Sequence, residues 1–293
     1  MKKFTRAIYC TLIAVLLAFM PAVAGAASAD MLVLGNDLTE SQQATVLRLL
    51  GVTESNPVDE TLYITIGEEK ALLGTLVSAD KIGSRSLSSA RVQLKEDDYG
   101  IKVATHNITY ITDSMYASAL ITAGVTNADV IIAAPTNVSG TAALAGIFKA
   151  YEVASNVTLD SIAKAVASEE LLLSGELAEF IGSEEAVRLI GDLKQTVIDN
   201  GWDNIETIRP AVDETARQMN LNLTDAQKNQ VANLLLKFCS LDMEPEEIAS
   251  QLQGMLNAMK TAANATEAVN SFFGKVGEAL SSVGSWFANL FKR

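Results

Sequence analysis

Residues 99–135 read YGIKVATHNITYITDSMYASALITAGVTNADVIIAAP, and this stretch decides the fold class. Apolar and polar residues alternate over 99–106, apolar residues dominate a helix-length segment at 114–124, and residues 128–135 are almost continuously apolar. These patterns predict a strand, a helix and a strand that is buried on both faces.

Upstream of this stretch, the sequence predicts a strand, a helix and a second strand, at residues 61–66, 68–79 and 90–96. Asp97 and Asp98 separate two alternating segments, which is the signal of a hairpin. The resulting order is that of the ferredoxin-like βαββαβ unit. We therefore predict an α+β fold whose first domain, residues 30–155, is a ferredoxin-like sheet unit with helices on one face. A further helix at 138–154 leads away from it.

The second predicted domain, residues 156–260, is helical throughout, because apolar residues recur there at three- and four-residue steps. Its junctions carry helix-ending glycines and helix-starting residues such as Thr224 and Pro245. The predicted helices are residues 160–175, 184–199, 204–220, 224–240 and 245–260.

The first 29 residues have the composition of a secretory signal peptide. Three basic residues stand among the first six, residues 7–20 are an apolar run too short to span a bilayer, and Ala27-Ser28-Ala29 offers the small residues of a cleavage site. We expect export, cleavage near Ala29, and an extracellular or cell-envelope location.

The last segment, residues 261–293, is predicted to be an amphipathic C-terminal helix. Large apolar residues face small polar ones, which suits docking on a membrane surface or an envelope protein through residues 264–293. The alternative is a last helix that closes the core. The docking candidates are Phe272, Phe273, Trp286, Phe287 and Phe291.

Composition excludes several classes of function. The formal net charge of −13 argues against nucleic acid as a partner, because binding a polyanion requires clustered Lys and Arg. Cys239 is the only cysteine outside the leader, so no internal disulfide is expected, and helical spacing predicts a buried, inert thiol. His106 is the only histidine. We therefore expect no metal and no cofactor.

The segment PTNVSGT (135–141) is the best candidate for a small-ligand site. It lies between a predicted strand and a predicted helix, so the backbone N–H groups of Ser139, Gly140 and Thr141 are candidates to hold an anion or carboxylate. Arg85, in the polar loop 83–89, is a further anion-binding candidate. The alternative is that Thr136 or Asn137 simply caps the predicted helix that follows.

Two weaker patterns leave other functions open. His106, with Asp113 and the serines of the 83–89 loop, could form a hydrolase, although no G-x-S-x-G motif supplies a nucleophile. LTESQQATVLRLLGV (38–52) and LTDAQKNQVANLLLKFC (223–239) share a capping-box start and a Leu-rich face. They are either a duplicated unit, able to pair between copies in an assembly role, or a common way to begin a helix.

Longer phrases carry a family resemblance. They are LGNDLTESQ, TLYITIG, THNITYITDSMYASALITAGVTNADVIIAAP and VSGTAALAGI. Over roughly residues 31–260 the chain resembles the YpuA-like family of uncharacterised exported proteins of Gram-positive bacteria, domain of unknown function 1002. The resemblance implies export and residence in the cell envelope or medium, and it carries no catalytic residues.

We therefore expect an exported, non-enzymatic, cell-envelope-associated or secreted binding protein whose ligand the sequence does not name. The alternatives are an extracellular hydrolase and a structural or assembly protein.

Overall fold

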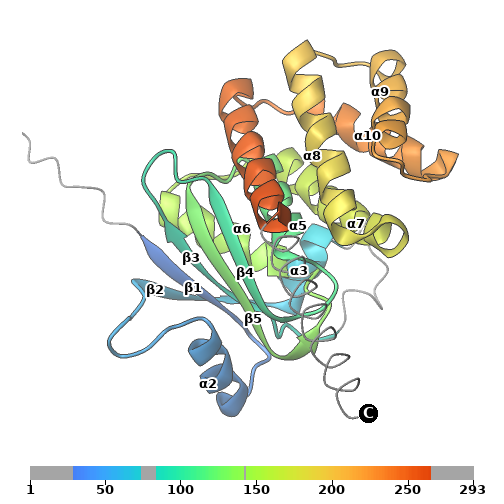
Figure 1. Ribbon diagram of the computed structural model, residues 1–293. Coiled ribbons are helices and arrows are strands. Elements are labelled where there is room, and N and C mark those ends of the chain that lie inside the picture. The colour runs from blue at the N-terminus through green and yellow to red at the C-terminus, as the bar shows by residue number, and fades with distance from the viewer. Residues whose placement is uncertain (1–28, 74–83, 142, 265–293) are drawn as a thin grey trace, which may run out of the picture.

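The computed structural model describes residues 29–73, 84–141 and 143–264. Within these ranges, five strands form one sheet in the order β2-β1-β3-β5-β4 (Figure 1). β1 and β2 run parallel, as do β4 and β5, whereas β3 is antiparallel to both of its neighbours. The strands are β1 (Asp30–Gly35), β2 (Glu60–Ile64), β3 (Ser89–Leu94), β4 (Ile101–Ile108) and β5 (Ala128–Val138).

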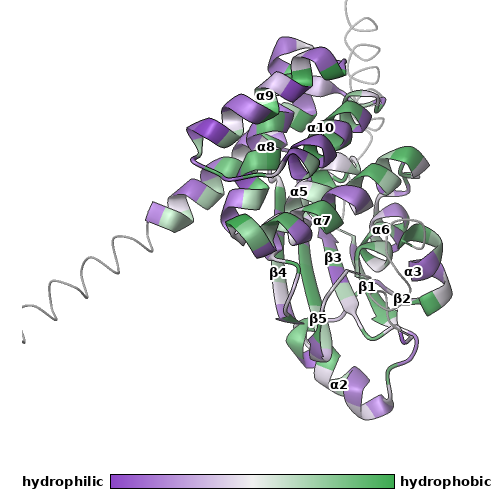
Figure 2. Ribbon diagram, turned by 90° about the vertical axis from the view of Figure 1, so that its right-hand side faces the viewer, coloured by the Kyte–Doolittle hydropathy of each residue, from purple (hydrophilic) through white to green (hydrophobic). Residues whose placement is uncertain are grey.

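Helices cover one face of the sheet in two layers. The alternate residues Val33, Val92 and Val130 are buried on this face, together with helices α5 (Asp113–Thr122) and α6 (Ala143–Ser155). α5 is buried from Met115 to its end at Thr122, because α7 (Ser161–Ile181) and α8 (Ser183–Asn200) pack on its outer side. The hydrophobic colour in Figure 2 gathers on β5 and α5, between the sheet and the outer helices.

The remaining helices with defined bounds are α2 (Glu40–Leu49), α3 (Ile66–Leu73), α9 (Ile205–Gln218) and α10 (Asp225–Cys239). One more helix, residues 245–264, follows α10. Among the described residues, no helix is both long enough and apolar enough to cross a membrane.

α2 lies on the opposite face of the sheet and away from the other helices (Figures 1 and 2). Buried Arg91 holds it there: the guanidinium donates to the carbonyl oxygens of Leu50 and Gly51 at 3.3 and 3.1 Å, where α2 ends. The same group pairs with both carboxylate oxygens of Asp30 at 2.8 and 2.5 Å. The apolar residues buried beneath α2 are Leu32, Leu34, Val46, Leu50 and Ala133.

The predicted α+β class is confirmed, but the strand order is not the ferredoxin-like one. β1 was not predicted, and it lies between β2 and β3. The expected hairpin at Asp97 and Asp98 does not pair its strands, because β5 lies between β3 and β4. β5 carries the apolar run over residues 128–134, and its place between β3 and β4 gives it a hydrogen-bonded neighbour at each edge. The predicted helix at 68–79 is α3 up to Leu73, and its remainder lies outside the described residues.

The helical segments appear where their periodicity predicts them, with α7 continuing to Ile181. The two LT-x-x-Q segments form the predicted capping boxes. Thr39 and Thr224 each accept a hydrogen bond from the backbone N–H three residues on, and the Gln side chain there accepts from the threonine N–H. α2 follows a strand and α10 follows a helix, so the shared motif is a common helix start in two different surroundings.

A buried ion pair joins the outer helices α7 and α8, and hydroxyl groups of the inner helix α5 bond to it. Lys194 Nζ of α8 lies 2.8 Å from Glu170 Oε1 of α7, and each side chain is 1% exposed. The hydroxyls of Ser118 and Thr122 on α5 each donate to a Glu170 oxygen at 2.5 Å. Glu170 stands in the middle of α7, surrounded by these partners.

Candidate functional site

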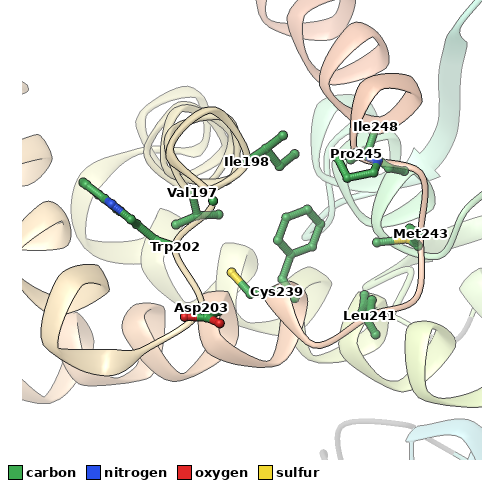
Figure 3. Close-up of a pocket in the computed structure, with 11 residues that line it drawn as sticks. Val197, Ile198, Trp202, Asp203, Cys239, Leu241, Met243, Pro245 and Ile248 are labelled. Carbon is green, nitrogen blue, oxygen red and sulfur yellow. The ribbon is translucent and has the colours of Figure 1, made fainter.

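An apolar pocket forms where the ends of two helices meet the start of a third. α8 ends at Gly201, whose positive φ of 62° lets the chain turn, with the Trp202 N–H bonding back to the carbonyl of Val197 at 3.0 Å. α10 ends at Cys239, and the residues after it lead directly to Pro245, where the helix 245–264 begins. The pocket therefore combines segments that lie far apart in the sequence (Figure 3).

The pocket has a volume of about 220 Å³. Cavities of about 150 Å³ hold a benzene-sized group, whereas pockets for drug-sized ligands begin at about 300 Å³. The space thus suits one aromatic ring or one branched side chain. Its apolar lining is Val197, Ile198, Trp202, Phe238, Leu241, Met243, Pro245 and Ile248.

Two polar side chains, Asp203 and Cys239, lie on the same side of the pocket (Figure 3). Burial raises the pKa of the Cys239 thiol, and the negative charge of Asp203 raises this pKa further. The thiol therefore stays protonated at neutral pH. Cys239 is half-buried, whereas the helical spacing predicted a buried side chain. The lining residues include no histidine, lysine or arginine that could activate the thiol. The size and lining of the pocket therefore suit an apolar group.

The predicted anion site lies between β5 and α6, as expected, but its residues are engaged in packing. Gly140 has a φ of 94°, and its carbonyl accepts a hydrogen bond from the Tyr116 hydroxyl at 2.5 Å. Thr141 is buried, whereas Ser139 is exposed. The strand continues to Val138, so the expected cap residues of the segment belong to β5. Anion binding here stays a prediction.

Arg85 does not join that segment. Its Nη2 atom donates to the backbone oxygen of Asp37 at 2.9 Å, which ties the loop before β3 to the end of β1. Throughout the described ranges, no hydrogen bond or ion pair connects Arg85 with Ser139, Gly140 or Thr141.

The groups of the hydrolase alternative do not come together either. His106 lies exposed on β4 and has no hydrogen bond or ion pair to Asp113 within the part of the chain that the structure describes. Ser86 and Ser88 are buried, and the Ser86 hydroxyl donates to Glu69. The described residues also contain no group of three or more potential metal ligands.

Sequence reasoning missed one buried acid. Glu69 on α3 is 1% exposed, and its Oε1 accepts from the Ser86 hydroxyl at 2.5 Å, while its Oε2 has no partner among the described residues. Burial raises the pKa of this carboxyl to about 7, and nearby Asp37 adds to the effect. The signal was available, because Glu69 stands four residues before the buried Leu73, on the same helical face.

The predicted docking residues, Phe272, Phe273, Trp286, Phe287 and Phe291, lie outside the described residues, as does the expected leader up to residue 28.

Comparison with known proteins finds one family. A family model described as "Protein of unknown function (DUF1002)" matches residues 34–255. The chain is 39% identical over 283 residues to the uncharacterized protein YpuA of Bacillus subtilis (strain 168), an alignment that covers 95% of this chain and 96% of the relative. No solved structure matches the chain.

Proposed function

The chain belongs to the DUF1002 family of proteins of unknown function, and we propose that it is an exported, non-enzymatic binding protein of the cell envelope or medium. In this proposal, the helical layer receives one apolar group of the ligand. The observation that carries it is the pocket of about 220 Å³ at the ends of α8 and α10.

The lining supports binding over catalysis. The polar groups there are a carboxylate and a thiol whose pKa is raised, and a carboxylate beside a thiol opposes thiolate formation. A group that enters the pocket leaves water and contacts apolar side chains, so the hydrophobic effect provides the affinity.

Export and envelope association belong to the same proposal and are supported by the sequence of residues 1–29 and 264–293. The helix that starts at the pocket with Pro245 leads along the chain toward the second of these segments. Expression with the leader in a Gram-positive host tests export. The product is expected in the envelope or medium, and its mass is expected to be that of a chain that begins near Asp30. Full-length protein that stays in the cytosol would refute export.

Two substitutions at one position test the pocket. Cys239→Phe fills the space and Cys239→Ala enlarges it, with indole as the probe and backbone amide NMR shifts as the readout. Indole is expected to shift the signals around Gly201 and Met243 in the parent and in Cys239→Ala, and not in Cys239→Phe. The proposal fails if indole shifts nothing, or if Cys239→Phe responds like the parent.

Docking of the C-terminal segment needs a separate measurement. Deletion of residues 264–293 is expected to abolish flotation with liposomes or capture by envelope material, while the indole response persists. If the shortened chain floats with liposomes and is captured by envelope material as the full chain is, the C-terminal segment does not dock, and this part of the proposal is wrong.

A further inference from the structure

A second cavity lies on another side of the helix 245–264. It is a groove of about 580 Å³ between this helix and the first residues of β4 with the turn before them. Gly191 of α8 sets the position of the helix, because a Cβ at Gly191 would lie only 2.9 Å from Leu256 Cδ2. Successive residues of a helix are rotated by about 100° around its axis. Pro245 and Ile248 line the apolar pocket, and the residues between Glu246 and Ala258 that line the groove lie on a different side of the same helix.

The side-chain amide of Gln251 lines this groove, and both of its polar atoms are buried without a partner among the described residues. A buried polar group without a hydrogen bond costs about 1–3 kcal/mol. An amide requires an acceptor for its N–H and a donor for its oxygen. A peptide group offers both, side by side.

The rim of the groove is acidic. Asp98, Glu246 and Glu247 are exposed, and none of them forms an ion pair within the described ranges. Lys102 also lines the groove, and its ammonium lies 3.8 Å from the centre of the ring of Tyr99, another lining residue. Three carboxylates against one ammonium leave the groove with a net negative charge, which complements a cation on the ligand.

The groove also lies at the edge of the sheet. β4 is the last strand in the sheet order and pairs with β5 on one side, and no described strand pairs with its other side. An edge strand has backbone groups that an added extended chain can bond. Backbone groups, an orphaned amide and an acidic rim therefore meet in one groove.

We propose that this groove binds an extended polypeptide segment that carries a lysine or arginine side chain. The peptide backbone bonds Gln251 and the start of β4, and the cation lies between Asp98 and the carboxylates of Glu246 and Glu247. This site goes beyond the proposed function, since it uses neither the apolar pocket nor the segments expected to direct export and docking.

Gly254 provides the test that least disturbs the fold. It is exposed on the helix, and a Cβ built there meets no atom within 4 Å. A Cβ therefore enters this position without a clash, and Gly254→Leu is expected to fill the groove. Replacing a helical glycine also stabilises the helix by about 1 kcal/mol. Titration calorimetry of the full chain uses the synthetic peptide acetyl-Thr-Val-Lys-Val-Lys-Val-amide as the probe, and the same peptide with Glu in place of Lys as its control.

The lysine peptide is expected to bind, and the glutamate peptide to bind at least about tenfold more weakly. Gly254→Leu is expected to abolish binding while the melting temperature stays equal or rises. Gln251→Leu is expected to weaken binding about tenfold at any salt concentration, since it removes a desolvated hydrogen-bonding group. The pair Glu246→Gln and Glu247→Gln is expected to weaken it mainly at low salt.

Glu184→Gln with Glu185→Gln, at the start of α8 and outside this groove, is the matched charge control and is expected to leave the affinity unchanged. The inference is overturned if the lysine peptide does not bind at low salt, or if the folded Gly254→Leu variant binds it as the parent does. Loss of this binding with an intact indole response leaves the apolar pocket unaffected, so the two proposals fail separately.

Discussion

Replacing Glu69 by glutamine should remove a pH dependence that this carboxyl imposes on the free energy of unfolding. Burial raises its pKa from 4.5 to about 7 in the folded protein. Between these two values the unfolded chain loses the proton while the folded chain keeps it, so the unfolded state binds fewer protons and stability falls as the pH rises. Below 4.5 both states are protonated, and above about 7 the loss is complete.

The size of the effect follows from the same two values. A tenfold difference in proton affinity is worth about 1.4 kcal/mol, so ionising Glu69 in the folded protein costs about 3 kcal/mol. Part of this cost is present at pH 5, and the change between pH 5 and pH 8 is about 2.5 kcal/mol. The amide introduced by Glu69→Gln keeps an oxygen for the Ser86 hydroxyl and never ionises.

Urea unfolding at pH 5 and pH 8 measures this difference for the parent and for Glu69→Gln. The advantage of the variant over the parent is expected to grow by about 2.5 kcal/mol from the lower to the higher pH. Glu68→Gln is the matched control: Glu68 is exposed and its hydrogen bond to Lys149 lowers its pKa, so this variant should keep the falling pH profile. Parallel pH profiles for the parent and Glu69→Gln would refute the reasoning.

Two more substitutions test the core. Lys194→Met is expected to lower the free energy of unfolding in urea by about 3–5 kcal/mol, because it leaves Glu170 buried without its cation. The double variant, Lys194→Met with Glu170→Leu, should recover most of the loss. Equal stability of the parent and the single variant would contradict this. Gly140→Ala is expected to lower the melting temperature, by a free-energy cost above about 1 kcal/mol, because φ is 94° and the new Cβ would lie 2.4 Å from Ile108 Cγ2 and 2.6 Å from the Tyr116 hydroxyl oxygen. An unchanged melting temperature would show that the turn relaxes.

Local patterns predicted most of the helices and strands. The capping boxes at Thr39 and Thr224 are contacts between residues three apart, so the sequence contains all that they require. The alternation over residues 99–106 and the apolar run over 128–135 likewise gave β4 and β5 their type. β1 was missed because its short apolar run directly precedes a strong helix start and resembles the lead-in to that helix.

The candidate site was less accessible to the same reasoning. Cys239 was predicted to be a buried thiol, whereas it is half-buried and lines a pocket whose other residues come partly from the end of α8 and the start of the helix 245–264. Glu170 lies inside the predicted helix 160–175, and nothing in the local pattern shows that it is the buried partner of Lys194. Such pairings depend on which helices become neighbours, and the spacing of apolar residues within one helix does not show which neighbour it will have.

The amino-acid sequence by itself determined the α+β class, the helix starts and the family, because each rests on residues close together in the chain or on long matching phrases. Tertiary structure alone decided the place of β5 between β3 and β4, the burial of Glu69 and Lys194, and both cavities beside the helix 245–264. The physical reason is that strand order and the burial of charge minimise the free energy of the whole packed chain, in which contacts between distant residues outweigh local preference.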